Sequence, residues 1–117
     1  MGDLLYDKQD VMSLLEKCDG KLTILISHNP DYVDNLVKDG NHKKIDLMLS
    51  GDTHGGQVTF FGLWTPFLRT ESAKSHRSGA FDIENMKLIV SNGIGVLGVP
   101  LRLWARPEIN VILLKKQ

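Results

Sequence analysis

The chain has 117 residues, of which 42% are hydrophobic and 24% charged, and its 14 basic residues balance 14 acidic ones. This length predicts a single domain over residues 1–117 with the composition of an ordinary globular protein. The zero net charge argues against a strong field for nucleic acid or an anionic membrane. No apolar run approaches the roughly 20 residues of a membrane-spanning helix. No cleavable signal pattern opens the chain, so a cytoplasmic protein is expected.

Helices and strands are predicted to alternate in the first half of the chain. The apolar periodicity indicates helix, strand, helix and strand, in that order, over residues 7–17, 22–26, 32–37 and 45–49. The second helix starts near Asn29 or Asp31, which are good capping residues. Because the run 22–26 is apolar throughout, it is expected to be a fully buried strand. A strand–helix–strand unit this short predicts parallel neighbours with a right-handed crossover.

The second half of the chain has a weaker pattern. Residues 58–61 suggest a short strand, and 63–76 an irregular, partly mobile loop. Residues 81–90 fit a hairpin that turns at Glu84-Asn85, and 109–114 fit a last strand.

Candidate metal ligands follow both strands of the first half. His28 comes just after 22–26, and Asp52 and His54 follow 45–49 among several glycines. If the strands are parallel neighbours, these side chains converge at the carboxyl edge of the sheet, where α/β proteins build sites. Carboxylate and imidazole groups both bind divalent metals. The pattern therefore predicts part of a metal site.

These motifs resemble those of a known family. Ser-His-Asn-Pro-Asp over 27–31 and Ser-Gly-Asp-Thr-His-Gly-Gly-Gln-Val over 50–58 look like the C-terminal half of calcineurin-like metallophosphoesterases. The nearest likeness is the bacterial phosphodiesterase branch with the signature Gly-His-Thr-His-Gly-Gly-Gln. The segments 90–95 and 99–102 and the tail from Arg106 fit the same branch.

The resemblance implies a function and a ligand set. Members of this family hydrolyse phosphomonoesters or phosphodiesters with two divalent transition metals, of the kind of Mn, Fe or Zn. On this chain the matching positions make His28, Asp52 and His54 metal ligands, and no residue maps to a catalytic acid or base. The implied partner is a phosphate ester substrate. No platform for nucleic acid is evident.

The chain also departs from the family pattern. The family's first three motifs, Asp-x-His, Gly-Asp-x-x-Asp and Gly-Asn-His-Asp/Glu, cannot be placed before His28. Asp52 stands where the family usually has histidine. Asp52-Thr53-His54 spells Asp-x-His, but the Gly-Gly-Gln-Val that follows marks the later motif. With at most three ligands, the chain is expected to hold one metal or none and to be weak or inactive alone. The alternative is a non-catalytic remnant that acts as a protein-association module.

The resemblance further implies a fold. The expected architecture is α/β, as half of a metallophosphoesterase-type β-sandwich flanked by helices, with a mixed sheet that contains a β-α-β unit. Half of a sandwich leaves an apolar face uncovered, which monomers rarely tolerate. The expected partner is therefore a second copy in a homo-oligomer or a missing N-terminal half.

Simpler roles stay open for several of these residues. From the residues alone, His28 is as readily a structural histidine, and Asp52 a turn residue. His42, beside two lysines, is expected to be exposed to solvent. The glycines of 92–95 could cradle a phosphate, but a plain turn is the favoured interpretation. A forked phosphate contact is open to Arg102, although a surface position is favoured.

Overall fold

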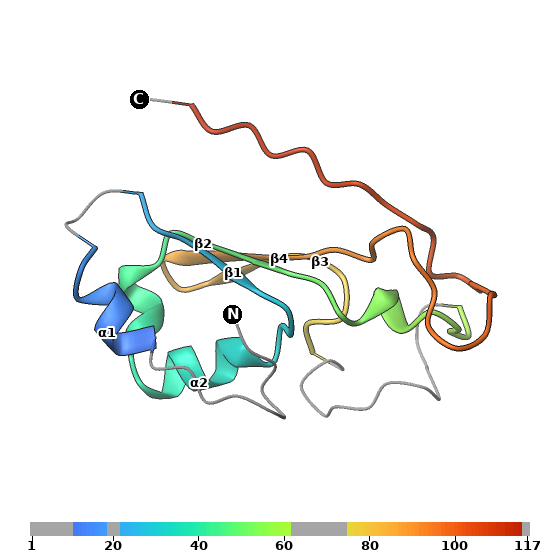
Figure 1. Ribbon diagram of the computed structural model, residues 1–117, viewed down its shortest axis with the longest axis horizontal. Coiled ribbons are helices and arrows are strands. Elements are labelled where there is room, and N and C mark those ends of the chain that lie inside the picture. Colours follow the sequence, from blue (N-terminus) through green and yellow to red (C-terminus); the bar gives the residue numbers. More distant parts are fainter. Residues whose placement is uncertain (1–10, 19–21, 62–74, 116–117) are drawn as a thin grey trace.

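Four strands form one mixed sheet in the order β1-β2-β4-β3 (Figure 1). The computed structural model describes residues 11–18, 22–61 and 75–115, and every structural statement below concerns those residues. The strands are β1 (Ile24–Ser27), β2 (Leu47–Ser50), β3 (Gly79–Ile83) and β4 (Met86–Val90). β2 is parallel to both β1 and β4, whereas β3 is antiparallel to β4. The predicted α/β class and the β-α-β unit are confirmed.

Short helices connect these strands. They are α1 (Val11–Leu15), α2 (Tyr32–Lys38) and the 3-10 turns η1 (Asn41–Lys44) and η2 (His54–Gly56). The first predicted helix is confirmed over α1, while residues 7–10 lie outside the described part of the chain. None of the helices in the described ranges has the length and apolar character needed to cross a bilayer.

Local chemistry explains where α2 begins and ends. Before the helix, the Asn29 side chain accepts a hydrogen bond from the backbone N–H of Asp31 at 2.8 Å, as an Asx turn does. Inside it, Val33 and Leu36 are each 1% exposed, and this three-residue spacing places both on the core side. After it, Gly40 has φ +73°, the left-handed conformation that ends helices.

The hydrophobic core lies on one face of the sheet. Figure 1 shows α1 and α2 together on that side, with the C-terminal segment on the other side. Met48 of β2 and Leu88 and Val90 of β4 are fully buried against α2. Because strand side chains alternate between faces, these three residues share the helix-covered side.

The opposite face of the sheet is largely open, which corrects the expectation of a fully buried first strand. Ile24 and Ile26 of β1 are 38% and 68% exposed. Ile26 pairs across the sheet with Leu49, which in turn pairs with Ile89, so apolar side chains form a row on this face. β1 is apolar on both sides, but the helices cover only one of them.

In the described part of the chain, two predicted strands do not pair as regular strands. Residues 109–114 lie outside the four strands, and Val111 in this segment is 92% exposed. At 58–61 the structure shows isolated bridges rather than a regular strand, among them those from Val58 to Leu103 and Trp104. Most of the loop predicted over 63–76 lies outside the described residues.

The predicted hairpin is confirmed, and its turn explains a wrong expectation for His42. β3 and β4 meet at Glu84-Asn85, as expected. His42 is 2% exposed rather than on the surface. Its Nε2 lies 3.0 Å from a Glu84 carboxylate oxygen, and its Nδ1 lies 3.3 Å from the Leu36 carbonyl oxygen. Two polar partners make burial of the imidazole acceptable, and the ring ties η1 to the hairpin.

Candidate functional site

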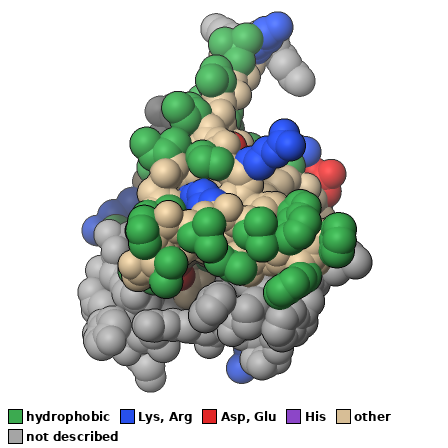
Figure 2. All heavy atoms as spheres, turned by 90° about the vertical axis from the view of Figure 1, so that its right-hand side faces the viewer, with side chains coloured by type: hydrophobic (Ala, Val, Ile, Leu, Met, Phe, Trp, Pro, Cys, Tyr) green, Lys and Arg blue, Asp and Glu red, His purple; other side chains and the backbone are tan. Residues whose placement is uncertain are grey.

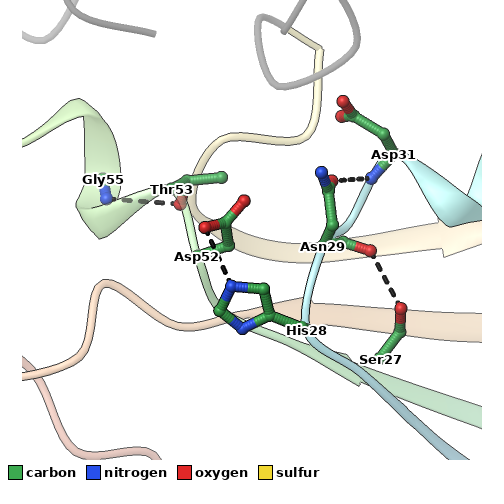
Figure 3. Close-up of polar contacts among 7 residues, drawn as sticks. All are labelled: Ser27, His28, Asn29, Asp31, Asp52, Thr53 and Gly55. Carbon is green, nitrogen blue, oxygen red and sulfur yellow. Dashed lines mark hydrogen bonds and ion pairs between the residues drawn. The ribbon is translucent and has the colours of Figure 1, made fainter. Parts of the chain in front are cut away.

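His28 and Asp52 come together at the carboxyl edge of two adjacent parallel strands. Ser27 pairs with Ser50 at the ends of β1 and β2, so the residues that follow each strand are neighbours. His28 Nε2 lies 3.0 Å from Asp52 Oδ1, and the two side chains point toward each other (Figure 3). Their side chains are 57% and 42% exposed, so the pair is open to solvent. The structure therefore brings together two of the three predicted ligands.

The loop before α2 holds His28 in place. Ser27 is buried and its hydroxyl donates to the carbonyl oxygen of Asn29 at 3.0 Å. The backbone N–H of Gly51 donates to the carbonyl oxygen of His28 at 3.1 Å. The Ser27–Asn29 bond shapes the turn that carries His28 (Figure 3), and the Gly51–His28 bond fixes the two strand ends relative to each other.

Asp52 and His54 sit in a turn with unusual backbone angles. Both have positive φ, of 66° and 49°, in a region that residues with a side chain visit rarely. The buried Thr53 stabilises the turn, because its hydroxyl donates to the carbonyl oxygen of Arg77 and accepts from the N–H of Gly55. Strained angles of this kind gather at functional sites.

Gly55 is required where this turn meets the loop after β4. It has φ +63°, and a Cβ built there would lie 2.3 Å from Oδ1 of Asn92. No other residue type fits so close to Asn92 unless the Asn92 side chain moves. The glycine of the sequence motif therefore sets how closely two segments of the site approach.

His54 faces a different set of groups from His28. Its Nδ1 lies 3.3 Å from the carbonyl oxygen of Gly95 and 3.5 Å from the guanidinium of Arg102. A histidine that gives its Nδ1 proton to a carbonyl leaves Nε2 as the free ligand atom, which is the usual arrangement around a metal-binding imidazole. The structure shows no contact that joins His54 to the His28–Asp52 pair.

Arg102 is a central organiser of the site that the sequence did not reveal. The sequence favours an ordinary surface arginine, but its side chain is half-buried and donates mainly to backbone carbonyl groups. The acceptors belong to three segments: His54 at 3.1 Å, Asn92 at 2.8 Å, Gly93 at 3.2 Å, Gly95 at 2.9 Å and Ala105 at 3.1 Å. Five donors in a planar fork suit this role, which a lysine cannot fill. A phosphate contact would have to compete with these bonds.

The imidazole and carboxylate side chains are suitable ligands for a divalent cation, but there are too few of them in the described residues to complete a metal site. Imidazole and carboxylate groups suit Mn, Fe or Zn. Zinc sites take three or four protein ligands. Within residues 11–18, 22–61 and 75–115, no group of three His, Cys, Asp or Glu side chains is arranged to hold a metal ion. A metal bound by this chain would need donors from elsewhere.

Comparison with known proteins supports the same class. The chain is 32% identical to the metallophosphoesterase YkuE of Bacillus subtilis over 118 residues, which cover 98% of the chain and 39% of that protein. It is 35% identical to the protein YpbG of Bacillus subtilis over 87% of the chain and 35% of that protein. It is 33% identical to the phosphodiesterase YaeI of Escherichia coli over 76% of the chain and 31% of that protein.

These matches indicate the class of protein to which the chain is related, and they show how much of those proteins it spans. Over most of its length the chain is homologous to metallophosphoesterases. It spans 39% or less of the length of these three relatives, so it corresponds to a part of them. No family model matches the chain. No solved structure matches it either.

Proposed function

We propose that the chain is the C-terminal part of a metal-dependent phosphoesterase and supplies His28, Asp52 and His54 to a metal centre completed by groups outside this chain. The complete centre hydrolyses phosphomonoesters or phosphodiesters with divalent transition metals. The isolated chain is weak or inactive, because its own donors are too few. In the complete protein its sheet forms half of a β-sandwich.

One observation carries this proposal. The imidazole of His28 and the carboxylate of Asp52 meet 3.0 Å apart at neighbouring strand ends, open to solvent. A single divalent cation placed between two such groups could bind both. The homology to metallophosphoesterases gives this pair its chemical interpretation.

Metal titration tests the ligand set. Calorimetric titration of the chain with Mn should show weak binding that Asp52→Asn and His28→Asn each reduce. Asp39→Asn is the matched control, since Asp39 is exposed and lies at the far end of α2. Mn binding that is unchanged in both Asp52→Asn and His28→Asn would contradict the assignment of these residues.

An activity assay tests the second part of the proposal. With a chromogenic phosphodiester and added Mn, the purified chain should hydrolyse no more substrate than buffer containing Mn. Turnover in the ordinary enzyme range of about 1–10³ s⁻¹ would show that the chain is complete by itself.

The open face of the sheet favours a second candidate, a protein-association module without catalysis. Ile24 and Ile26 are exposed beside Leu49 and Ile89 on a face that the helices do not cover. Such a face is normally covered by another protein surface. The occupant is either a second copy of the chain or the missing half of the sandwich. Light scattering tests the first of these: an oligomer that Ile26→Glu dissociates supports it, and a monomer at all concentrations excludes it.

A further inference from the structure

The loop after β4 turns apolar side chains outward and several of its peptide groups inward. It lies at the end of the molecule that carries η2, where Figure 2 shows hydrophobic side chains gathered across the described surface. Its Ile94, Leu97 and Leu101 are 72%, 65% and 51% exposed. Several peptide groups of the same loop are instead bonded within the protein, to the side chains of Gln57 and Arg102.

Gln57 holds the far part of this loop. Its amide oxygen accepts from the N–H of Leu97 at 2.6 Å, and its amide nitrogen donates to the carbonyl groups of Leu97 and Val99 at 2.9 Å each. Because Gln57 directly follows η2, these bonds tie the loop to the turn that carries His54. The loop therefore lies against the imidazole of His54, whose Cε1 is 3.8 Å from the place of a Cβ on Gly95.

The guanidinium of Arg102 holds the near part of the loop and uses all of its protons there. A guanidinium carries five protons, one on Nε and two on each Nη. Its nitrogen atoms lie 2.8–3.2 Å from five backbone carbonyl oxygens, two at Nη1, two at Nη2 and one at Nε, which belong to His54, Ala105, Asn92, Gly93 and Gly95. Protons and acceptors therefore match one to one.

This match leaves no proton of Arg102 for the imidazole of His54. Nδ1 of His54 lies 3.5 Å from Nη2, farther than any of the five carbonyl oxygens lies from its nitrogen. Nη2 also approaches the Gly95 oxygen, so its two protons have three carbonyl oxygens nearer than the imidazole. Nδ1 lies 3.3 Å from the Gly95 oxygen, which has two lone pairs. Since two acceptors cannot bond each other, this contact requires a proton on Nδ1.

We propose that Arg102 is a positioning residue: through the carbonyl group of Gly95 it holds the proton of His54 on Nδ1 and leaves the lone pair of Nε2 free. The hydrogen bond made by one ring nitrogen decides the state of the other. The structure gives Nε2 of His54 no partner among the described residues. The use of that lone pair for a metal rests on the proposed function, whereas the position of the proton does not.

His28 provides an internal reference with the opposite arrangement. Its Nε2 lies 3.0 Å from Oδ1 of Asp52. An ionised carboxylate only accepts hydrogen bonds, so His28 carries its proton on Nε2. The two imidazoles should therefore give opposite patterns in one NMR spectrum, and replacement of Arg102 should change only that of His54.

Long-range proton–nitrogen NMR spectra of the isotope-labelled, metal-free chain test the proposal. At alkaline pH, where histidine is neutral, the unmodified chain should show the proton on Nδ1 of His54. Arg102→Lys lacks the planar fork and releases the Gly95 carbonyl group. It should lower the ratio of the Nδ1–H to the Nε2–H form of His54 about fivefold, the equilibrium value of one ordinary hydrogen bond.

Arg106→Lys is the matched control for this substitution. Arg106 is exposed, and its contact with the Asn92 side chain uses only its backbone carbonyl group. The control should leave the tautomers of both His54 and His28 unchanged. Circular dichroism spectra that match the unmodified chain establish that each variant is folded.

A second measurement needs no substitution. In the unmodified chain, a scalar coupling across the hydrogen bond should join Nδ1 of His54 to the carbonyl carbon of Gly95. The guanidinium protons of Arg102 should exchange slowly with water, because all of them are bonded. This result tests the role of Arg102 even if Arg102→Lys does not fold.

Several outcomes would overturn the proposal. These are a proton on Nε2 of His54 in the unmodified chain, fast exchange of the Arg102 protons, an unchanged His54 tautomer in folded Arg102→Lys, or an equal change in Arg106→Lys. All of these measurements are made without metal, so their failure is distinct from failure of the metal titration that tests the proposed phosphoesterase site.

Discussion

The approach of Gly55 to Asn92 makes a sharp prediction at the scale of one residue. Gly55→Ala should destabilise the chain by about 1–2 kcal/mol for the left-handed backbone and a further 1–3 kcal/mol or so for the clash. Urea unfolding measures this loss. Gly51→Ala is the control, because a Cβ there meets nothing within 4 Å and should cost little. Equal stability of the two variants would contradict the tight contact.

The contact between Glu84 and His42 predicts a dependence of stability on pH. The hydrogen bond from His42, and then its charge, hold the pKa of Glu84 below the ordinary value of 4.5. A group whose pKa falls on folding stabilises the folded chain above its unfolded pKa and loses that contribution as pH falls through the folded pKa. Glu84→Gln should therefore be less stable than the unmodified chain near neutral pH.

Unfolding curves at a series of pH values test this expectation. The difference between Glu84→Gln and the unmodified chain should shrink as pH drops below 4.5. Glu16→Gln, at an exposed position near α1, serves as the control for the loss of a surface carboxylate. A difference that stays constant down to strongly acidic pH would show that the carboxylate charge plays no part.

Sequence reasoning worked for residues whose role is local and failed for those whose partners are distant. His28 and Asp52 are predictable because each directly follows a strand, and parallel strands end at one edge. His42 was wrongly expected at the surface, since its partner Glu84 lies 42 residues away in the chain. The assignment of His28, Asp52 and His54 as metal ligands stays a prediction.

At the scale of elements, the β-α-β unit and the hairpin were predictable because their signals are contiguous. Apolar runs, the Asx turn of Asn29 and the terminating Gly40 all act within a few residues. The segment 109–114 is an apolar run that suits a strand, yet among the described residues it pairs with no strand. Periodicity shows which segments can pair, but it does not supply the neighbour.

Arg102 joins three segments, so its replacement should affect elements rather than one contact. Arg102→Lys keeps the charge but cannot reach carbonyl groups on both η2 and residues 92–95. We expect Arg102→Lys to cost about 1.5–3 kcal/mol, nearly as much as Arg102→Ala. Unfolding measures the cost, and amide spectra should show His54 and Gly95 shifting together.

A second arginine provides the control for this prediction. Arg106 is exposed and only its backbone carbonyl is used, by the Asn92 side chain. Arg106→Lys should leave stability within about 0.5 kcal/mol of the unmodified chain. If Arg102→Lys were equally harmless, the carbonyl contacts of Arg102 would contribute little.

At the scale of the whole molecule, the helices cover one face of the sheet and leave the other open. Residues 109–115 extend on the open side (Figure 1), where Ile109 and Leu113 are 80% and 75% exposed. Deleting 109–117 should therefore change the unfolding free energy of the isolated chain by about 0.5 kcal/mol or less. Leu88→Ala, at a fully buried position, should cost about 2–5 kcal/mol and serves as the contrast.

A large loss on tail deletion would mean that the segment packs on the sheet in solution. The sequence alone could not decide this point, because the apolar run over 109–114 fits a paired strand equally well. To form a strand, residues 109–114 need a neighbouring strand with which to pair. The described sheet leaves β1 and β3 as edge strands, and the structure pairs residues 109–114 with neither of them.

The side-chain amide of Gln57 holds the segment around Leu97 and Val99, and this amide can hydrolyse slowly with time. Slow hydrolysis of its side-chain amide to a carboxylate would replace a donor with an acceptor, opposite the carbonyl groups of Leu97 and Val99. The two carbonyl oxygens would then repel the new carboxylate, and the segment around Leu97 and Val99 would lose its contacts with residue 57. An aged preparation should thus acquire one extra negative charge and lose the order of this segment, with its core still folded.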